Sequence, residues 1–319
     1  MRNIHLLVTF LLLAVFLADA GTQHEPRRQI IHREVAITFD DLPLQEHRLS
    51  IELQTRITRA LLQSITSNNV PAFADVNEGK LYVGGKPDPA RVGLLKLWLD
   101  AGVELGNHTF SHADLQTMPL ANYEADVIRG EKITKKLLQE KGLRLRYFRH
   151  PVLHTGPDLG TKRAFERFLA AHGYTIAPVT IDNQDFMFAE VYARAKKRGD
   201  IVTMRRVADA YVPYMEKMFD FFERLSMASL GYEVKQILLL HANELNADHF
   251  DDLARMMKRR GYAFITLEQA LKDKAYGLPD AQTPRGLSWL HRWMLAKGEA
   301  MEPEPREPDF ITQLFNAYH

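Results

Sequence analysis

The sequence predicts an α/β fold, a distorted (β/α) barrel of about seven strands with a helical insertion and a C-terminal extension. Helical stretches end in a glycine that is followed at once by a strand-like run, and this pattern repeats along the chain. A glycine just past a helix end accepts the left-handed conformation that closes the last turn and returns the chain to a sheet. Such junctions indicate repeated βα units with mainly parallel strands.

The first predicted strand is 35–39, where β-branched and aromatic residues favour a buried strand. A helix over the apolar positions 60–65 follows it. The other predicted strands are 71–76, 103–105, 143–148, 174–176, 236–240 and 262–265, four of which directly follow Gly102, Gly142, Gly173 and Gly261. About seven strands suit a barrel. A doubly wound open sheet is the alternative, but no glycine-rich phosphate loop follows the first strand, as its dinucleotide binders require.

Two segments fall outside the regular βα pattern of the predicted barrel, which spans 34–275. Residues 187–230 are longer than one crossover helix and rich in aromatic residues, so we predict a helical insertion. Residues 276–319 contain several prolines and a short amphipathic piece in which Trp289 and Trp293 lie one helical turn apart. We predict an extension packed on the barrel, with its aromatic side chains buried rather than exposed to bind sugar.

The N-terminus has the features of a secretory signal. Arg2 precedes an apolar run over 6–17, which ends in Ala18-Asp19-Ala20. The run is too short to span a bilayer. We therefore expect 1–20 to be a cleaved signal peptide and 21–33 a polar leader. The protein would then act outside the cytoplasm, in the periplasm or secreted, with no stable membrane anchor after cleavage.

The overall composition is that of an ordinary folded protein. Of the 319 residues, 46% are hydrophobic and 25% are charged, and the formal net charge is +1. No long block of lysine or arginine is present, so the sequence argues against nucleic acid as a partner. The chain has no cysteine. An exported form would therefore depend on core burial and not on disulfides.

Chemically active side chains cluster where predicted strands end. Asp40 and Asp41 follow the first strand, and His108 and His112 come soon after 103–105. Two histidines four residues apart share a face and can converge on one metal ion. Each cluster alone could also have no role in function. The acid pair could form an ordinary turn before Pro43, and the histidines could be two surface side chains.

Three more clusters fall at strand ends. Residues 149–151 read Arg-His-Pro, 182–186 contain two aspartates, and His241 closes an apolar strand. In a barrel these ends share one rim, where active sites gather. One aspartate and two histidines form a common ligand set that leaves positions open for water and substrate.

The order and types of these residues resemble the NodB-like polysaccharide deacetylases, a carbohydrate esterase family built on a distorted (β/α) barrel. The resemblance covers roughly 34–272. Its five motifs correspond to Thr38-Phe39-Asp40-Asp41, His108-Thr109-Phe110-Ser111-His112, Arg149-His150-Pro151, Asp182 to Phe186, and Leu239-Leu240-His241. The resemblance implies a hydrolase that removes N-acetyl groups from an amino-sugar polysaccharide or oligosaccharide, and the N-terminal signal implies that it is exported.

The resemblance also implies a role for each residue. Asp41, His108 and His112 would bind a divalent metal, usually zinc, with cobalt or nickel as alternatives. Asp40 would be the general base and Arg149 its orienting partner. His241 would be the general acid, tuned by an aspartate of the fourth motif, with Asp185 preferred over Asp182.

Amide hydrolysis needs a water of lowered pKa, a polarised carbonyl and a proton for the departing amine. The metal would supply the first two, Asp40 would accept the proton of water, and His241 would protonate the amine.

The sequence departs from the family pattern around the expected substrate site. The family's third motif commonly continues with a second proline and an aromatic residue near a glycine, whereas Val152 follows Pro151 here. Phe186 stands where the family commonly has tryptophan. These changes bear on the substrate, and we regard Pro151, Val152, His154 and Phe186 as candidate substrate contacts.

Two other functions compete with this expectation. The same metal site on a related barrel could serve an acetyl-ester esterase or a small-molecule amidohydrolase. A non-catalytic glycan-binding protein on a decayed barrel is the other alternative. Binding alone would not need a base, three metal ligands and an acid together.

Overall fold

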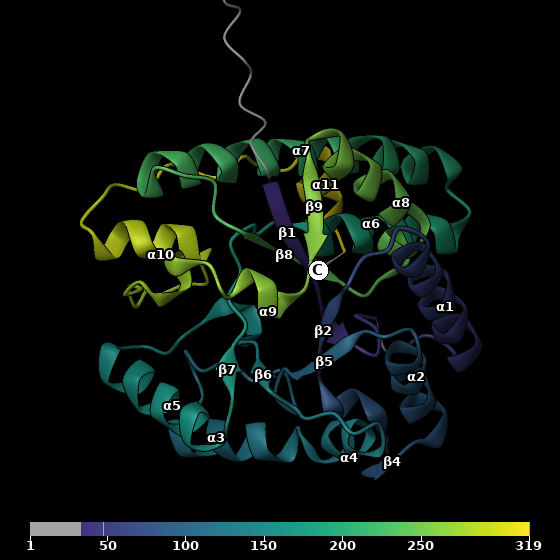
Figure 1. The fold of residues 1–319 in the computed structure, drawn as a ribbon. Coiled ribbons are helices and arrows are strands. Elements are labelled where there is room, and N and C mark those ends of the chain that lie inside the picture. The colour runs from purple at the N-terminus through teal and green to yellow at the C-terminus, as the bar shows by residue number, and fades with distance from the viewer. Residues whose placement is uncertain (1–32, 47, 319) are drawn as a thin grey trace, which may run out of the picture. The chain divides into compact units, whose positions relative to one another are not determined.

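The computed structural model describes residues 33–46 and 48–318, which form a mainly parallel sheet surrounded by helices (Figure 1). The predicted signal peptide 1–20 lies outside the described residues, as does all of the leader 21–33 except Arg33. The sheet strands are β1 (Arg33–Leu42), β2 (Phe73–Val76), β5 (Glu104–Asn107), β6 (Tyr147–Phe148), β7 (Thr175–Ile176), β8 (Gln236–His241) and β9 (Tyr262–Ile265). A strand forms within or across each of the predicted runs, which confirms the distorted (β/α) barrel.

The strands run parallel in the order β7-β6-β5-β2-β1-β8, and β9 pairs with the first half of β1. The chain after β7 then returns to β8, because Ile181 forms a parallel bridge with Leu238. The segment 175–181 thus contacts both ends of the strand order and curls the sheet. Because β1, β5 and β8 run parallel, their carboxyl ends lie at the same rim of the sheet.

The helices cover this sheet on the outside. Asp88, Asp158 and Asn243 each cap the helix that follows them with a side-chain oxygen. The helices are α1 (Ile51–Ser67), α2 (Pro89–Asp100), α3 (Leu120–Arg129), α4 (Lys132–Glu140), α5 (Leu159–Ala171), α6 (Asp185–Arg198), α7 (Ile201–Leu230), α8 (Glu244–Arg259), α9 (Leu267–Ala270), α10 (Trp289–Ala296) and α11 (Asp309–Asn316), and a small hairpin pairs β3 (Tyr82–Val83) with β4 (Lys86–Pro87).

The main core lies between the sheet and α1, α2 and α8. Phe39 of β1 is fully buried, and its ring centre lies 5.8 Å from that of Trp98 and 5.7 Å from that of Phe250. Burial of large aromatic side chains supplies much of the hydrophobic stabilisation of such a core. It also fixes the strand that carries Asp40 and Asp41.

Residues 187–230, for which we predict an insertion, fall in α6 and α7. The two helices are joined at Gly199, which has a positive φ of 70°. The aromatic side chains of this segment are buried, so they pack in the core. They are Phe188, Tyr192, Tyr211, Tyr214, Phe219, Phe221 and Phe222. No helix in the described ranges is long and apolar enough to cross a membrane.

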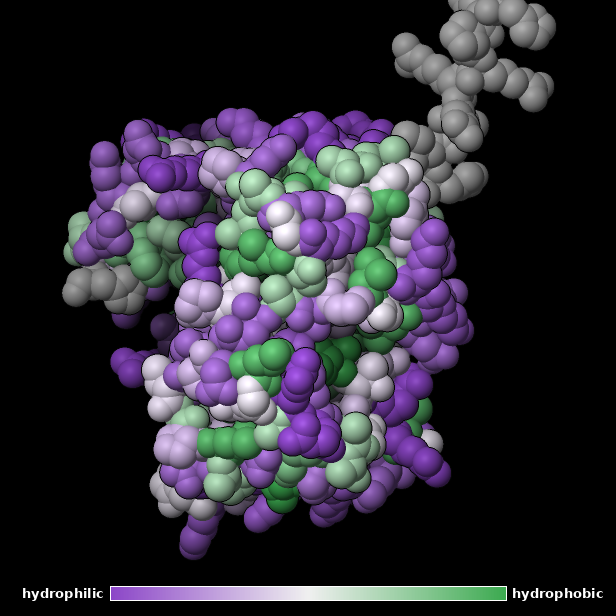
Figure 2. Space-filling view, turned by 90° about the vertical axis from the view of Figure 1, so that its left-hand side faces the viewer, coloured by the Kyte–Doolittle hydropathy of each residue, from purple (hydrophilic) through white to green (hydrophobic). Residues whose placement is uncertain are grey.

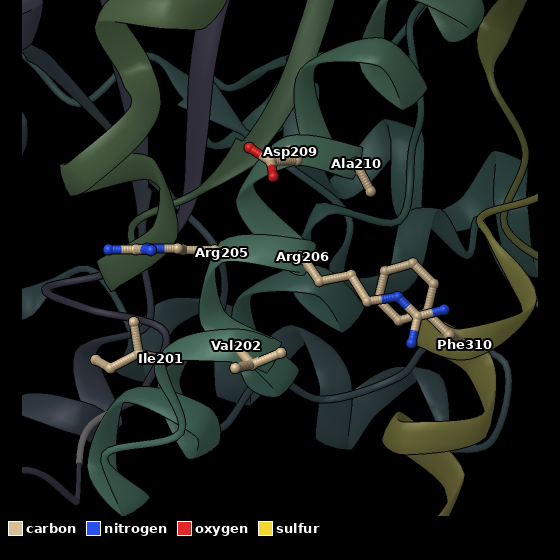
Figure 3. Close-up of a pocket in the computed structure, with 7 residues that line it drawn as sticks. All are labelled: Ile201, Val202, Arg205, Arg206, Asp209, Ala210 and Phe310. Carbon is tan, nitrogen blue, oxygen red and sulfur yellow. The ribbon is translucent and has the colours of Figure 1, made fainter.

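The surface of the described residues is mixed in character. On the face shown in Figure 2, hydrophobic side chains lie in small patches between hydrophilic ones. A shallow pocket of about 540 Å³ lies between the first turns of α7 and Phe310 of α11 (Figure 3). There the guanidinium of Arg206 lies 3.8 Å from the centre of the Phe310 ring. This cation–π contact helps to hold α11 against α7.

The C-terminal segment from Ala281 to α10 is joined to the barrel by hydrogen bonds. Ser288 Oγ donates to the Thr180 carbonyl at 2.7 Å, and the Trp289 amide donates to the Val179 carbonyl at 2.7 Å. Arg292 is fully buried. It donates to Leu153 O at 2.7 Å, Ala281 O at 3.0 Å, Thr155 Oγ1 at 3.1 Å and Leu287 O at 3.2 Å.

We expect Arg292→Met to lower the free energy of unfolding by at least about 2 kcal/mol, because buried acceptors without a donor each cost about 1–3 kcal/mol. Urea unfolding of this variant, compared with Arg144→Met, measures the effect. Arg144 is exposed, so its replacement should change stability little. Equal stability of the two variants would contradict a structural role for Arg292.

Candidate active site

Two adjacent carboxylates at the end of β1 have different partners. Asp40 accepts hydrogen bonds from Arg149 Nη1, at 3.1 Å to Oδ1 and 3.4 Å to Oδ2. Asp41 has a positive φ of 72°, and its Oδ1 lies 3.6 Å from Nε2 of His112 and 3.4 Å from Nζ of Lys80. The turn at Asp41 therefore directs the two side chains to separate neighbours.

The two histidines lie beside Asp41, with ring centres 5.0 Å apart. Nδ1 of His108 lies 2.9 Å from the Arg149 carbonyl oxygen. A carbonyl oxygen only accepts, so Nδ1 carries the proton and Nε2 has a free lone pair. Metal-ligating histidines commonly bond to a carbonyl in this way, which fixes the tautomer and the ring orientation.

The loop that carries the histidines is shaped by Asn107. Its Oδ1 accepts from the Thr109 amide at 2.8 Å, and its Nδ2 donates to the Tyr174 hydroxyl at 2.9 Å. Thr109 and His112 have positive φ values of 64° and 56°, which are uncommon outside glycine. The asparagine and the loop together turn both histidines toward Asp41.

Asp41, His108 and His112 fit a divalent metal ion. Their potential ligand atoms all lie within 4.8 Å of one another. Asp41 Oδ1 is buried and accepts no hydrogen bond from a described residue. An unsatisfied buried oxygen beside a free histidine nitrogen is what a metal site requires before the ion is bound.

The ionisation of these groups agrees with that fit. Burial raises the pKa of Asp41, but Lys80 and His112 outweigh it and hold the pKa below the ordinary value. Burial, and then the charge of His112, lowers the pKa of His108 well below its usual range. A charged carboxylate and a neutral imidazole are the forms that bind metal.

Asp40 is held on its other side by a buried arginine. Arg149 is fully buried, and it also donates to Thr38 Oγ1 at 3.1 Å and to the Ala177 carbonyl at 2.5 Å. Burial raises the pKa of Asp40, and the charge of Arg149 offsets part of that effect. A fixed carboxylate whose pKa is raised is a better proton acceptor than an ordinary aspartate.

His241 is in register with Asp40 across the β1–β8 pair and contacts a second buried acid. Its Nδ1 lies 2.6 Å from Oδ1 of Asp185, whose Oδ2 accepts from the His241 amide at 2.8 Å and from Asn246 Nδ2 at 2.9 Å. Burial opposes the imidazolium, but Asp185 outweighs it and raises the pKa of His241 to about 9. Nδ1 is bonded to Asp185, so Nε2 is the nitrogen left to donate a proton.

The structure thus brings Asp40, Arg149, Asp185 and His241 to the rim that carries the three candidate metal ligands. Asp182 does not bond to His241. Its carboxylate accepts from the Asn183 amide at 2.8 Å and lies toward the C-terminal segment, where burial and Glu304 raise its pKa to about 7.

The four candidate substrate contacts differ in their surroundings. Val152 is 51% exposed with a φ of 48°, whereas Pro151 is buried. The Phe186 ring centre lies 6.1 Å from that of His241. His154 Nδ1 lies 2.8 Å from Asp114 Oδ1, so this histidine already has a partner.

Several residues that support the site were not predicted from the sequence. Thr38 bonds to Arg149 and helps to orient it, and Asn246 does the same for Asp185. Lys80 lies beside Asp41. Asp75 is fully buried, with Oδ2 4.0 Å from Nε of Arg149. Asp75 is part of the predicted strand 71–76, so its position near the rim was a signal that could have been used.

The chain is similar to known proteins in its sequence and in its fold. A family model described as polysaccharide deacetylase matches residues 28–176, which include Asp40, Asp41, His108, His112 and Arg149. A search of curated proteins finds no match.

Among solved structures, a chitin deacetylase from the fungal pathogen Colletotrichum lindemuthianum is 22% identical with a TM-score of 0.50, and the match covers 75% of this chain and 87% of the other. A mutant of a CE4 family pseudoenzyme from Bacillus anthracis, with restored enzymatic activity, is 14% identical with a TM-score of 0.50, and the match covers 75% and 68%. At these identities the likeness shows the fold.

Proposed function

Because residues 28–176 match the polysaccharide deacetylase family model, we propose that this chain is a NodB-like polysaccharide deacetylase, an exported, metal-dependent hydrolase that removes N-acetyl groups from an amino-sugar polysaccharide or oligosaccharide. One observation carries the proposal. A buried acid held by Arg149 and a histidine held by Asp185 lie on neighbouring strands, beside three residues that fit a metal. A base, an acid and a metal site at one rim are the parts that amide hydrolysis needs.

Asp41, His108 and His112 would hold the ion, with zinc preferred and cobalt or nickel as alternatives. A divalent ion bound there polarises the acetyl carbonyl and lowers the pKa of water.

Asp40 accepts a proton from the attacking water, whose oxygen forms a bond to the acetyl carbon. Arg149 holds the Asp40 carboxylate in place through its Nη1. When the carbon–nitrogen bond breaks, His241 gives its Nε2 proton to the departing amine, and acetate leaves. Asp185 keeps His241 charged and oriented for that transfer.

The residues proposed to contact the sugar lie around this centre. Exposed Val152 is available to a ligand, and Phe186 offers an apolar wall beside His241. Pro151 shapes the turn before Val152. His154, bonded to Asp114, would contact substrate only through its remaining nitrogen.

An assay of acetate release separates this proposal from its alternatives. We expect release from N-acetylglucosamine oligomers to be faster than release from acetylated xylan at equal acetyl concentration. Faster release from the xylan would favour an acetyl-ester esterase, and activity confined to small amides would favour a small-molecule amidohydrolase. Binding of the oligomers with no acetate release, in metal-loaded protein, would favour a non-catalytic glycan-binding protein.

A further inference from the structure

A second polar pocket adjoins the candidate active site. It has a volume of about 310 Å³ and lies between the loop after Ile181 and the C-terminal segment. We call it the C-terminal pocket, and its polar lining consists of Asp182, Gln184, Arg285, His291, Glu304 and Arg306, with Glu302 at the same wall. The pocket is near the proposed general acid, because Asp185 of the same loop bonds to His241 and the charge of His241 acts on the pKa of the pocket residue Asp182. Its volume is at the lower end of the range of about 300–1,000 Å³ for ligand pockets.

The wall of this pocket is fixed to the barrel. Ser288 and Trp289 bond to the backbone at Thr180 and Val179, just before the Asp182 loop. A Cβ atom added to Gly286 would lie 2.0 Å from the Val152 carbonyl oxygen, so the two segments are in direct contact there. The C-terminal pocket therefore has a set position relative to Val152 and His241. The matched family region ends at residue 176, so the pocket belongs to a part of the chain that the family model does not describe.

The deeper part of the pocket is acidic. Asp182 and Glu304 are both half-buried, and Asp182 forms no ion pair with a lysine or arginine of the described chain. Burial, and then the charge of Glu304, raises the pKa of Asp182 to about 7. Arg285 and Arg306 are exposed at the mouth, and within the described ranges neither is within ion-pair distance of these two acids. Two neighbouring acids that no lysine or arginine of the described chain neutralises favour a cationic ligand.

His291 provides a separate indication of a ligand. It is 2% exposed, and its Nδ1 lies 3.2 Å from Glu304 Oε1. Neither ring nitrogen meets the geometry of a hydrogen bond with another described residue. Buried polar groups are nearly always satisfied, so the Nε2 atom of this pocket-lining histidine, which has no polar partner among the described residues, marks a place for a polar ligand.

The C-terminal pocket suits an organic cation better than a metal ion, because it does not bring three potential metal-ligand atoms of the described chain close together. Among the described residues, only Asp41, His108 and His112 bring three potential ligand atoms within 4.8 Å of one another. The proposed reaction itself produces the organic cation, because removal of an N-acetyl group leaves an amine that can be protonated. The guanidinium groups at the mouth and the Gln184 amide suit sugar hydroxyls.

We propose that the C-terminal pocket binds an amino-sugar unit with a free amine, next to the unit that is being deacetylated. This inference rests on the proposed function and names its substrate as a partly deacetylated glycan. The ammonium group lies between Asp182 and Glu304, and the Arg285 and Arg306 side chains contact the ring hydroxyls. The enzyme then acts preferentially beside units that have already lost their acetyl group.

Steady-state kinetics on defined oligomers test this preference. We compare the tetramer of N-acetylglucosamine with tetramers in which one unit carries a free amine. The wild-type enzyme is expected to show a KM about tenfold lower for one of the amine-bearing tetramers, the effect of a charge-assisted hydrogen bond. Glu304→Gln is expected to remove the difference. Glu299→Gln, a change of the same type outside the pocket, is expected to keep it.

A binding measurement supplies a readout that does not depend on turnover. Calorimetric titration with glucosamine, and with N-acetylglucosamine as the comparison, should show tighter binding of the amine, and this binding should weaken in Glu304→Gln and Asp182→Asn. Equal KM values in the wild type, or a preference that survives Glu304→Gln, overturn the pocket inference and leave the proposed function standing. Absence of acetate release from every tetramer overturns the proposed function, whatever the titration shows.

Discussion

Asp40→Asn is expected to abolish acetate release from N-acetylglucosamine oligomers while the metal stays bound. The carboxamide has nearly the shape of the carboxylate but cannot accept a proton from water. A general base contributes about 10²–10⁴-fold to such reactions, so we expect a loss of at least this size. Asp40 is not one of the three residues that fit the metal. Initial rates and metal content, measured on the same sample, check both parts of the expectation.

Asp100→Asn is the matched control for this variant. Asp100 is an exposed aspartate that pairs with Lys141 at the end of α2, and strand β5 separates it from His108 at the rim. It should keep full activity. Full activity in Asp40→Asn would contradict the assignment of the base, and loss of metal together with activity would place Asp40 among the ligands.

Asp185→Asn is expected to lower the rate by about 10²-fold or more and to move the alkaline limb of the pH–rate profile to lower pH. The general acid must be protonated, and Asp185 raises the pKa of His241 to about 9. Without that charge the pKa of His241 falls, so the proton is lost at a lower pH and activity declines earlier as the pH rises. The pH dependence of kcat/KM measures this shift, which general destabilisation would not produce.

Asp182→Asn provides the comparison within the same loop. Only Asp185 of the two acids bonds to His241 in the described chain, so Asp182→Asn should shift the alkaline limb less. Equal shifts in both variants would mean that the total charge of the loop, and not the bond to Asp185, sets the pKa of His241. An unchanged profile in Asp185→Asn would remove the proposed role of Asp185.

The strands were predictable because their signals are local. Runs of β-branched and apolar residues mark the buried parts of β1 and β8, residues 35–40 and 236–240, and a glycine precedes β5, β7 and β9. The predicted strand 143–148 is longer than β6. Only Tyr147 and Phe148 pair with neighbouring strands, and Leu143, Arg144 and Arg146 before them are exposed to solvent.

The candidate site was predictable for a topological reason. Parallel strands place their carboxyl ends at one rim, so clusters far apart in sequence, such as Asp40, His108 and His241, could be expected to meet. The choice between Asp182 and Asp185 was less secure, because the two acids lie three residues apart. The structure separates them, since α6 begins at Asp185 and directs that side chain inward.

Contacts that join distant segments left no local signal. Arg292 bonds to Leu153 and Thr155 across more than a hundred residues, and nothing in the sequence around either partner indicates the pairing. The C-terminal pocket has the same origin. Its two acids, Asp182 and Glu304, lie far apart in the sequence, and their segments meet only in the folded protein.

The central claim is that Asp41, His108 and His112 hold a divalent metal on which acetate release depends. The most direct measurement strips the protein with a chelator and then follows metal content and acetate release as zinc is added back. We predict that activity disappears on chelation, returns in proportion to bound zinc up to one ion per chain, and fails to return in His112→Ala. Acetate release at an undiminished rate from the metal-free protein would contradict the claim.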